Sequence, residues 1–250
     1  MPNETTDRPD PPTSTTPTIG PTLSELHERF LTRPVAEPPT AEEIERRKAS
    51  RERSQRHAEA DDFERTVGRR YELCCFTNFN AELPEQIVAL EECQQFVVDL
   101  QRHYRAGNGL LLFGPPGTGK DHLLVATARR AILDHGLSVL WVNGLDLYGE
   151  VRDRMDEDKN EAAFIRQHVR PNILCISDPL PPGGALTPFQ KQTMFRIIDN
   201  RYRERKPTWA TLNVSGAEDF GERMSEPIRD RLRDGAVCVH CNWPSYRGAK

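Results

Sequence analysis

One short stretch restricts the possible folds more than any other part of the chain: "LLLFGPPGTGKDHLL", residues 110–124. Gly114, Gly117, Gly119 and Lys120 match the G-x-x-x-x-G-K pattern of a phosphate-binding loop. The apolar run before the loop is typical of a buried strand, and the residues after it favour a helix. The glycines allow successive backbone N–H groups to face a phosphate, and the helix adds the positive end of its dipole. The stretch therefore predicts an α/β nucleotide-binding domain.

The loop supplies most of the residues that we expect to bind nucleotide: Gly114, Pro115, Pro116, Gly117, Thr118, Gly119, Lys120, Asp121 and His122. Lys120 adds a positive charge for the outer phosphates. Asp121 stands where a Ser or Thr usually contacts magnesium. A carboxylate is also a hard oxygen ligand for Mg²⁺, but it places a negative charge beside the phosphates. We therefore expect ATP and Mg²⁺ as cofactors, with nucleotide binding that depends strongly on the cation.

A second acidic residue follows the apolar run "NILCIS" and completes the expected magnesium site. Asp178 can order the magnesium shell directly or through water. The alternative is a carboxylate that caps a helix or a turn. The next residue in hydrolytic P-loop enzymes is usually a Glu that polarises the attacking water, but here it is Pro179, which has no base to offer. The sequence therefore predicts nucleotide binding at Lys120 and Asp178, with slow turnover.

The rest of the pattern predicts a five-stranded parallel sheet with helices on both faces. Short apolar runs cover residues 110–113, 138–143, 171–177, 207–213 and 236–241. Helical patterns cover residues 89–104, 120–131, 187–204 and 226–235. Strands that alternate with helices are typical of a parallel sheet between two helical layers. Little sequence follows the fifth run, so we expect a reduced or absent C-terminal lid.

Composition divides the chain into three parts. Residues 1–40 are rich in Pro and Thr, which predicts a disordered tail. Residues 41–70 form a highly charged helical arm, and Thr40 followed by Glu43 is a capping-box pattern at its start. This arm is either a solvated helix or a segment that binds a partner or nucleic acid. Residues 71–250 form the nucleotide-binding domain.

Charge and hydropathy limit the remaining function classes. The net charge of −4 argues against a nucleic-acid-binding surface that covers the whole protein. No stretch approaches the roughly 18 apolar residues that a membrane span needs, and the N-terminus has no signal-peptide pattern. We therefore expect a cytoplasmic protein without a membrane association. Cys238 and Cys241 have zinc-like spacing, but no second such pair follows, so free thiols are the preferred interpretation.

Four stretches together resemble the DnaC/IstB family of AAA+ ATPases, which comprises bacterial helicase loaders and transposition helper ATPases. These stretches are "GPPGTGKDHLL", "PNILCISD", "RKPTWATLN" and "ERMSEPIRDRLRDGAVCVHCNWPSYR". The resemblance covers about residues 71–247. Its most distinguishing part is the C-terminal one, an Arg-rich helix, a strand and then "NWPSYR", because a phosphate loop alone occurs in many families.

The resemblance implies roles for three further residues. Asn213 looks like the sensor 1 residue, which contacts the γ-phosphate or the attacking water. Arg231 looks like the arginine finger that reaches the nucleotide of a neighbouring subunit, and Arg247 resembles the sensor 2 arginine. Members of the family often have Asn at the position of Asp121, so the missing hydroxyl is a tolerated feature. Pro179 departs further from the pattern and puts fast hydrolysis in doubt.

The resemblance also implies partners. In the family, the AAA+ domain binds single-stranded DNA and assembles into a homo-oligomeric spiral, and the N-terminal region grips a replicative helicase or a transposase. Three functions compete: an ATP-dependent loader or helper, a non-hydrolysing nucleotide-dependent scaffold, which Pro179 motivates, and an unrelated kinase of a small molecule. The kinase would need a separate lid segment, which the sequence lacks. The chain by itself does not separate a helicase loader from a transposition helper.

Overall fold

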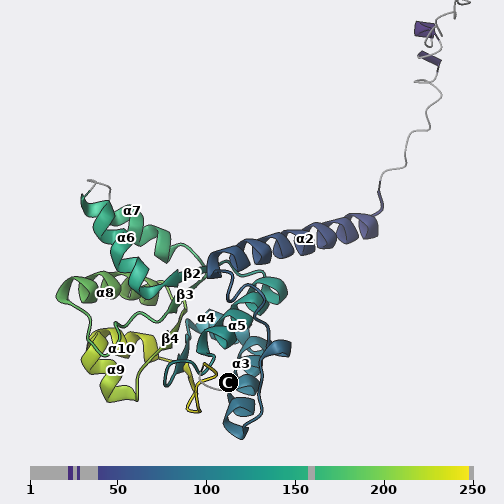
Figure 1. Ribbon diagram of the computed structural model, residues 1–250. Helices are drawn as coiled ribbons and strands as arrows, with labels where there is room; N and C mark the ends of the chain where they lie inside the picture. Colours follow the sequence, from purple (N-terminus) through teal and green to yellow (C-terminus); the bar gives the residue numbers. More distant parts are fainter. Residues whose placement is uncertain (1–21, 25–26, 29–38, 157–160, 248–250) are drawn as a thin grey trace, which may run out of the picture. The chain divides into compact units, whose positions relative to one another are not determined.

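A parallel sheet organises the protein (Figure 1). The computed structural model describes residues 22–24, 27–28, 39–156 and 161–247, so the tail predicted for residues 1–40 lies almost wholly outside the described residues. The strands are β1 (Leu110–Phe113), β2 (Val139–Asn143), β3 (Ile173–Ser177), β4 (Thr208–Leu212) and β5 (Val237–His240). Their order in the sheet is β2-β3-β4-β1-β5, and every neighbouring pair is parallel. All five predicted strands are therefore confirmed.

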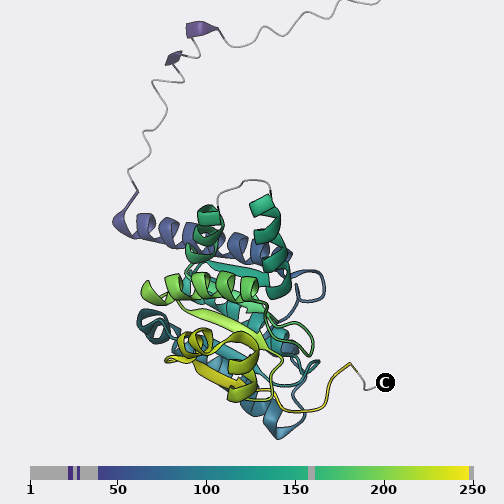
Figure 2. The same ribbon diagram turned by 90° about the vertical axis from the view of Figure 1, so that its left-hand side faces the viewer.

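Side chains of the strands alternate between two hydrophobic cores. Leu110 and Leu112 lie in one core, while Leu111 between them lies in the other. Helices α3 (Pro84–Val98), α4 (Leu100–Ala106) and α5 (Lys120–His135) supply the first core. Helices α6 (Gly144–Asp156), α7 (Glu161–Val169), α8 (Pro188–Arg203), α9 (Ala217–Met224) and α10 (Glu226–Arg233) supply the second. The two groups cover opposite faces of the sheet in Figures 1 and 2, so the predicted sandwich is confirmed.

Local sequence signals explain several helix boundaries. The Thr187 side chain accepts a hydrogen bond from the Gln190 backbone N–H and caps α8. The helix predicted over residues 89–104 is instead two helices, because α3 ends at Val98 and α4 begins at Leu100. Helices α6, α7 and α9 were not anticipated, since their short sequences mix charged and apolar residues.

The arm helix α2 (Ala41–Val67) begins with the predicted capping box. The Thr40 backbone N–H donates to Glu43 Oε2 over 3.0 Å, and the Glu43 N–H donates to Thr40 Oγ1 over 3.2 Å. The last turns differ from the rest, because Ala60, Phe63 and Val67 are buried in the first core. The chain divides into two compact units, Met1–Arg46 and Arg47–Lys250, so the C-terminal part of α2 belongs to the same unit as the sheet.

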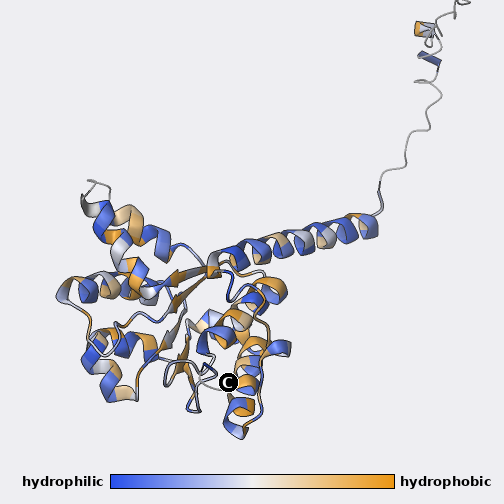
Figure 3. Cartoon of the chain, in the orientation of Figure 1, coloured by the Kyte–Doolittle hydropathy of each residue, from blue (hydrophilic) through white to orange (hydrophobic). Residues whose placement is uncertain are grey.

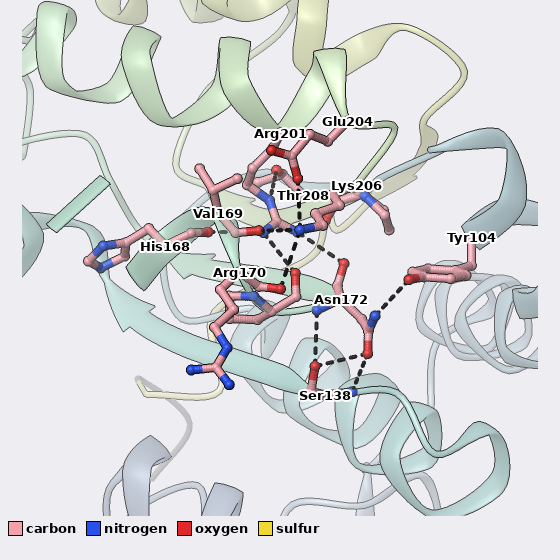
Figure 4. A network of polar contacts seen from close by, with 12 residues as sticks. Tyr104, Ser138, His168, Val169, Arg170, Asn172, Arg201, Glu204, Lys206 and Thr208 are labelled. Carbon is pink, nitrogen blue, oxygen red and sulfur yellow. Dashed lines mark hydrogen bonds and ion pairs between the residues drawn. The ribbon is translucent and has the colours of Figure 1, made fainter. Parts of the chain in front are cut away.

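A fully buried arginine, Arg201 of α8, fixes the sheet at the edge where β3 and β4 begin (Figure 4). Its guanidinium donates hydrogen bonds of 2.7–3.3 Å to the backbone carbonyls of His168, Val169, Pro171, Asn172 and Pro207, and to Thr208 Oγ1. Burial lowers the pKa of Arg201 to about 10, so the side chain stays charged at neutral pH. No sequence pattern predicts this role of Arg201.

Among the described residues, no helix combines the length and apolar character that crossing a membrane requires. The described chain has no helix after β5, up to Arg247.

Cys238 packs against the second core while Cys241 is buried in the first, so they lie on opposite sides of the sheet. One zinc ion could not be bound by both thiols.

Candidate nucleotide site

The phosphate loop lies at the carboxyl edge of the sheet, between β1 and α5, where α/β proteins bind their ligands. Gly114 and Gly119 adopt φ values of 145° and 84°, which disfavour any residue with a side chain. A Cβ at Gly114 would also collide with the carbonyl oxygen of Cys241. Within the loop, Lys120 Nζ donates to the carbonyls of Gly114 (2.9 Å) and Pro115 (2.7 Å). Burial lowers the pKa of Lys120, opposed by nearby acidic groups.

Asp121 is oriented by three hydroxyl groups. Its Oδ1 accepts hydrogen bonds from Thr211 Oγ1 at 2.7 Å and from Ser177 Oγ at 2.9 Å, at the ends of β4 and β3. Its Oδ2 accepts a longer bond, 3.3 Å, from the Tyr71 hydroxyl. Hydrogen bonds of a hydroxyl to a carboxylate are among the stronger ones in proteins. Oδ2 is therefore the less firmly held of the two oxygens.

Asp178 lies beside Asp121 in a strained backbone conformation, with φ at 47°. Its backbone N–H donates to both the carbonyl and the hydroxyl oxygen of Thr211 at 3.2 Å. Burial, and then the charge of Asp121, raise the pKa of Asp178, while Lys120 and a hydrogen bond with Asn213 oppose the rise. Oδ1 of Asp178 is buried without a hydrogen-bond partner among the described residues.

The two carboxylates fit a divalent cation. Mg²⁺ prefers hard oxygen ligands and is held by one or two carboxylates together with phosphate oxygens and water. An orphaned buried carboxylate oxygen on Asp178 and the weakly held Oδ2 of Asp121 supply such ligands. Asp121 therefore has the chemistry to serve the role of the usual loop hydroxyl.

Two segments distant in sequence enclose the loop in a cavity of about 380 Å³. The first is the C-terminal segment: the Tyr246 N–H donates to the carbonyl of Gly117 (2.9 Å), and Trp243 Nε1 donates to that of Thr118 (3.0 Å). The second, residues 70–80, contributes Phe79, whose ring meets those of His122 and Tyr246 edge-on. These aromatic side chains provide an apolar wall beside the phosphate loop.

The structure brings most of the predicted site residues to this cavity. Its lining includes Pro116, Gly117, Gly119, Lys120, Asp121, His122, Asp178, Asn213 and Arg247. Gly114 and Pro115 line a neighbouring cavity of about 490 Å³ on the other side of the loop, which also reaches Pro116 and Asn213. Thr118 points inward instead: it is fully buried, and its hydroxyl donates to the carbonyl of Pro115 (3.1 Å).

Arg231 is not part of the cavity of its own chain. Its Nε donates to Asp199 Oδ1 over 2.9 Å and its Nη1 to the carbonyl of Pro227 over 3.0 Å. The guanidinium also lies over the rings of Phe195 and Tyr202, 4.7 and 5.9 Å from their centroids. Nη2 has no hydrogen-bond partner in the part of the chain that the structure describes.

The residue after Asp178 is fixed in the fold. Pro179 packs so closely against Gly144 that a Cβ on this glycine would overlap it. The Tyr148 hydroxyl donates to the carbonyl of Pro179 at 3.3 Å. The site therefore contains no carboxylate at the position where a hydrolytic P-loop enzyme usually has its Glu.

Sequence reasoning missed several residues that shape the site. Ser177 and Thr211 position Asp121, and Tyr71 contacts it from the turn that follows the arm. Arg223 of α9 ties Asn213 to the loop after Asp178, because it donates to the carbonyls of Asn213 (2.7 Å), Pro181 (2.8 Å) and Gly184 (2.8 Å). Ser177 and Thr211 could have been found from the sequence, because polar residues at the carboxyl ends of predicted parallel strands lie where such sheets bind their ligands.

Comparison with known proteins identifies the family of the chain. Residues 42–250 match the family of the IstB-like ATP binding protein. The replicative helicase loader DnaC of Escherichia coli (strain K12) is 28% identical over 181 residues, which cover 71% of this chain and 70% of the relative. The ATP-binding protein of insertion sequence IS5376 from Geobacillus stearothermophilus is 29% identical over 147 residues, 55% of each chain.

Solved structures agree on the fold. The crystal structure of the DnaC helicase loader superposes with a TM-score of 0.63 at 24% identity and covers 69% of this chain and 99% of that one. AMPPCP-bound DnaA from Aquifex aeolicus gives 0.55 at 18% identity, over 69% of this chain and 50% of that one. The domain thus has the AAA+ P-loop fold. With a family match that runs from the arm helix to the last residue, the chain belongs to the family of IstB-like ATP-binding proteins.

Proposed function

We propose that this protein is an ATP-controlled helper that assembles on single-stranded DNA and delivers a replicative helicase or a transposase to it. The observation that supports the proposal most directly is the cavity at the phosphate loop, where Lys120, Asp121, Asp178 and Asn213 converge. The family match to ATP-binding proteins and the similarity to the DnaC loader favour the same function.

In this proposal Lys120 and the loop backbone bind the phosphates, and Asp121 with Asp178 hold Mg²⁺. The cation would neutralise the phosphate charge and so offset the repulsion from the two carboxylates. Lys120 now donates to two loop carbonyls and would exchange them for phosphate oxygens. Asn213 stands at the junction of the two cavities, where a γ-phosphate or an attacking water would meet it.

Assembly would use Arg231 and Arg247 in different ways. Arg247 lines the cavity of its own chain and would contact the bound nucleotide directly. Arg231 lies away from that cavity and has one unpartnered edge, which suits contact with the nucleotide of a second copy. A spiral of such copies would be formed only when nucleotide is bound.

Nucleotide titration of the full chain tests the proposal. We expect ATP to bind in the presence of Mg²⁺, with much weaker binding in EDTA, and Lys120→Ala to lose most of the affinity. Lys191→Ala, which removes a lysine of α8 that does not line the cavity, is the matched control and should bind as the wild type does. Equal affinities of the wild type and Lys120→Ala would overturn the proposal.

Pro179 favours a second candidate, a scaffold that binds nucleotide without hydrolysing it, because the site lacks the usual carboxylate at this position. Single-turnover hydrolysis with and without single-stranded DNA separates the two. Hydrolysis that disappears in Asp178→Ala would support the ATPase and refute the scaffold. Similarity to both DnaC and an insertion-sequence protein leaves two partner classes, which pull-downs with a purified helicase and transposase would distinguish.

A further inference from the structure

A segment of the arm helix carries a concentration of positive charge that the nucleotide site does not use. Residues 47–57 of α2, "RKASRERSQRH", contain five basic residues and one acidic residue, Glu52, and therefore carry a formal charge of +4. The whole chain carries −4, so the remaining residues together carry −8. Figure 3 shows α2 coloured mostly as hydrophilic. We call residues 47–57 the basic segment.

The cations of the basic segment are largely free of partners within the protein. Arg47, Lys48, Arg51 and Arg53 are exposed, and none of them forms a hydrogen bond or ion pair through its side chain among the described residues. Arg56 is half-buried and donates to the carbonyl of Asp134 at 3.3 Å. Elsewhere exposed arginines such as Arg102 and Arg130 pair with a carboxylate three or four residues away in sequence. The four exposed cations of the basic segment are therefore not paired with a carboxylate among the described residues.

The composition of the basic segment favours phosphate over a protein surface as its ligand. Its single apolar residue is Ala49. Stable protein interfaces depend on a few large apolar or aromatic anchors in their centre, which this segment does not have. Contacts with a nucleic-acid backbone need only cations and polar groups, which it has.

The arrangement of the cations favours a duplex. Successive residues of an α-helix are rotated by about 100°, so Arg47 and Arg51 share one flank of α2 and Arg53 lies on another, while Arg56 is already held by the carbonyl of Asp134. The major groove of B-form DNA is about 12 Å wide, admits an α-helix and has a phosphate backbone on both sides. A single strand follows one flank only, and the major groove of duplex RNA is too deep and narrow for side chains to read.

We propose that the basic segment of α2 binds double-stranded DNA through its phosphates, without sequence preference and without nucleotide. This activity is separate from the ATP-controlled binding of single-stranded DNA, and it would hold the protein at a junction between duplex and single strand. It extends the proposed function but does not depend on Lys120.

Fluorescence anisotropy with the full chain tests this inference, with a labelled DNA duplex, a single strand of the same length and an RNA duplex, all without nucleotide. Neutralising four phosphates gives a salt slope of about −3.6, so the affinity for duplex DNA should fall on the order of 100-fold between 50 and 200 mM salt. The variant carries Arg47→Gln, Lys48→Gln, Arg51→Gln and Arg53→Gln. Because Gln has a helix propensity close to that of Arg and Lys, the helix is retained, and circular dichroism checks this.

We expect this variant to bind duplex DNA at least about 10-fold more weakly at 50 mM salt, with most of the salt dependence lost. A control with the same change in net charge carries Arg65→Gln, Arg102→Gln, Arg105→Gln and Arg130→Gln, and it should bind duplex DNA as the wild type does. Lys120→Ala should also retain duplex binding, which separates this test from that of the nucleotide site. Unchanged duplex affinity in the first variant, or wild-type affinity for duplex RNA or single strands equal to that for duplex DNA, would overturn the inference.

Discussion

Replacing Thr211 by Val tests the role of the hydroxyl groups around Asp121. Thr211 is buried, and its hydroxyl donates to Asp121 Oδ1 at 2.7 Å and accepts from the Asp178 N–H at 3.2 Å. Valine has nearly the same shape, so the substitution removes the hydroxyl and little else. A hydrogen bond to a charged group contributes about 1.5–3 kcal/mol. Asp178 N–H keeps the Thr211 carbonyl as a second acceptor, so the main loss falls on Asp121.

The expected consequence is a weaker magnesium-dependent part of ATP binding. Residues that orient a metal ligand typically change metal affinity by about 10–100-fold when they are replaced. We therefore expect Thr211→Val to raise the Kd for ATP in Mg²⁺ by about 10-fold or more, in line with one lost charge-assisted bond. In EDTA, where no cation joins Asp121 to the phosphates, the two proteins should bind ATP equally. Titration of a fluorescent ATP analogue in both buffers measures both values.

Thr208→Val is the matched control on the same strand. Thr208 is also buried on β4, but its hydroxyl accepts from Arg201 at the opposite end of the strand. This variant should lose stability without losing magnesium-dependent affinity. A Kd for ATP in Mg²⁺ that stays within twofold of the wild type in Thr211→Val would show that Asp121 does not need its hydroxyl partners, and would refute the reasoning.

Three further changes have separate readouts. Asp178→Asn should stabilise the nucleotide-free protein at pH 7, because a raised pKa means that ionising Asp178 destabilises the fold. Thermal unfolding scans should show that this gain in stability shrinks as the pH falls toward 3.8, the ordinary pKa of an Asp. Arg201→Met should lower the free energy of unfolding by about 3–5 kcal/mol in urea titrations, because it leaves several buried carbonyls without a donor. The control Arg130→Met removes an exposed ion pair and should change the free energy of unfolding by less than about 1 kcal/mol. Arg231→Ala should leave the ATP affinity of dilute protein unchanged but reduce hydrolysis at concentrations that allow assembly, since Arg231 lies outside its own cavity; a loss of affinity in dilute protein would contradict the assignment.

The sheet could be predicted from the sequence because its inner strands β1, β3 and β4 are buried. A strand such as β1 then appears as an uninterrupted apolar run, Leu110–Phe113, and the glycine loop fixes where it ends. Amphipathic surface helices give a weaker signal. The sequence of α6 mixes charged residues with glycine and apolar residues. The helix starts where Asn143 Oδ1 accepts from the N–H groups of Leu145 and Asp146, a cap that can be recognised only once the end of β2 is known.

The phosphate loop and both carboxylates could be predicted because they follow local patterns, whereas their supporting residues could not. Thr211 lies 90 residues from Asp121 in sequence, and the two meet only because β4 pairs with both β1 and β3. Several strand orders are compatible with the same alternation of strands and helices, and each places a different strand end beside the loop. Tyr71 and Tyr246 present the same difficulty, since they come from segments without regular structure.

The contacts of Asp121 indicate that restoring the usual Ser or Thr at this loop position would not by itself restore the usual arrangement. In the usual arrangement the loop supplies a hydroxyl, and here the neighbouring strands supply two, from Ser177 and Thr211, to a carboxylate on the loop. Asp121→Ser would shorten the side chain and leave both hydroxyls without their acceptor in a largely buried setting, at a cost of about 1–3 kcal/mol for each unsatisfied group. It would also remove the nearby charge that raises the pKa of Asp178. Asp121, Ser177 and Thr211 therefore act as one unit, and the choice of loop residue follows from the ends of β3 and β4 rather than from the loop alone.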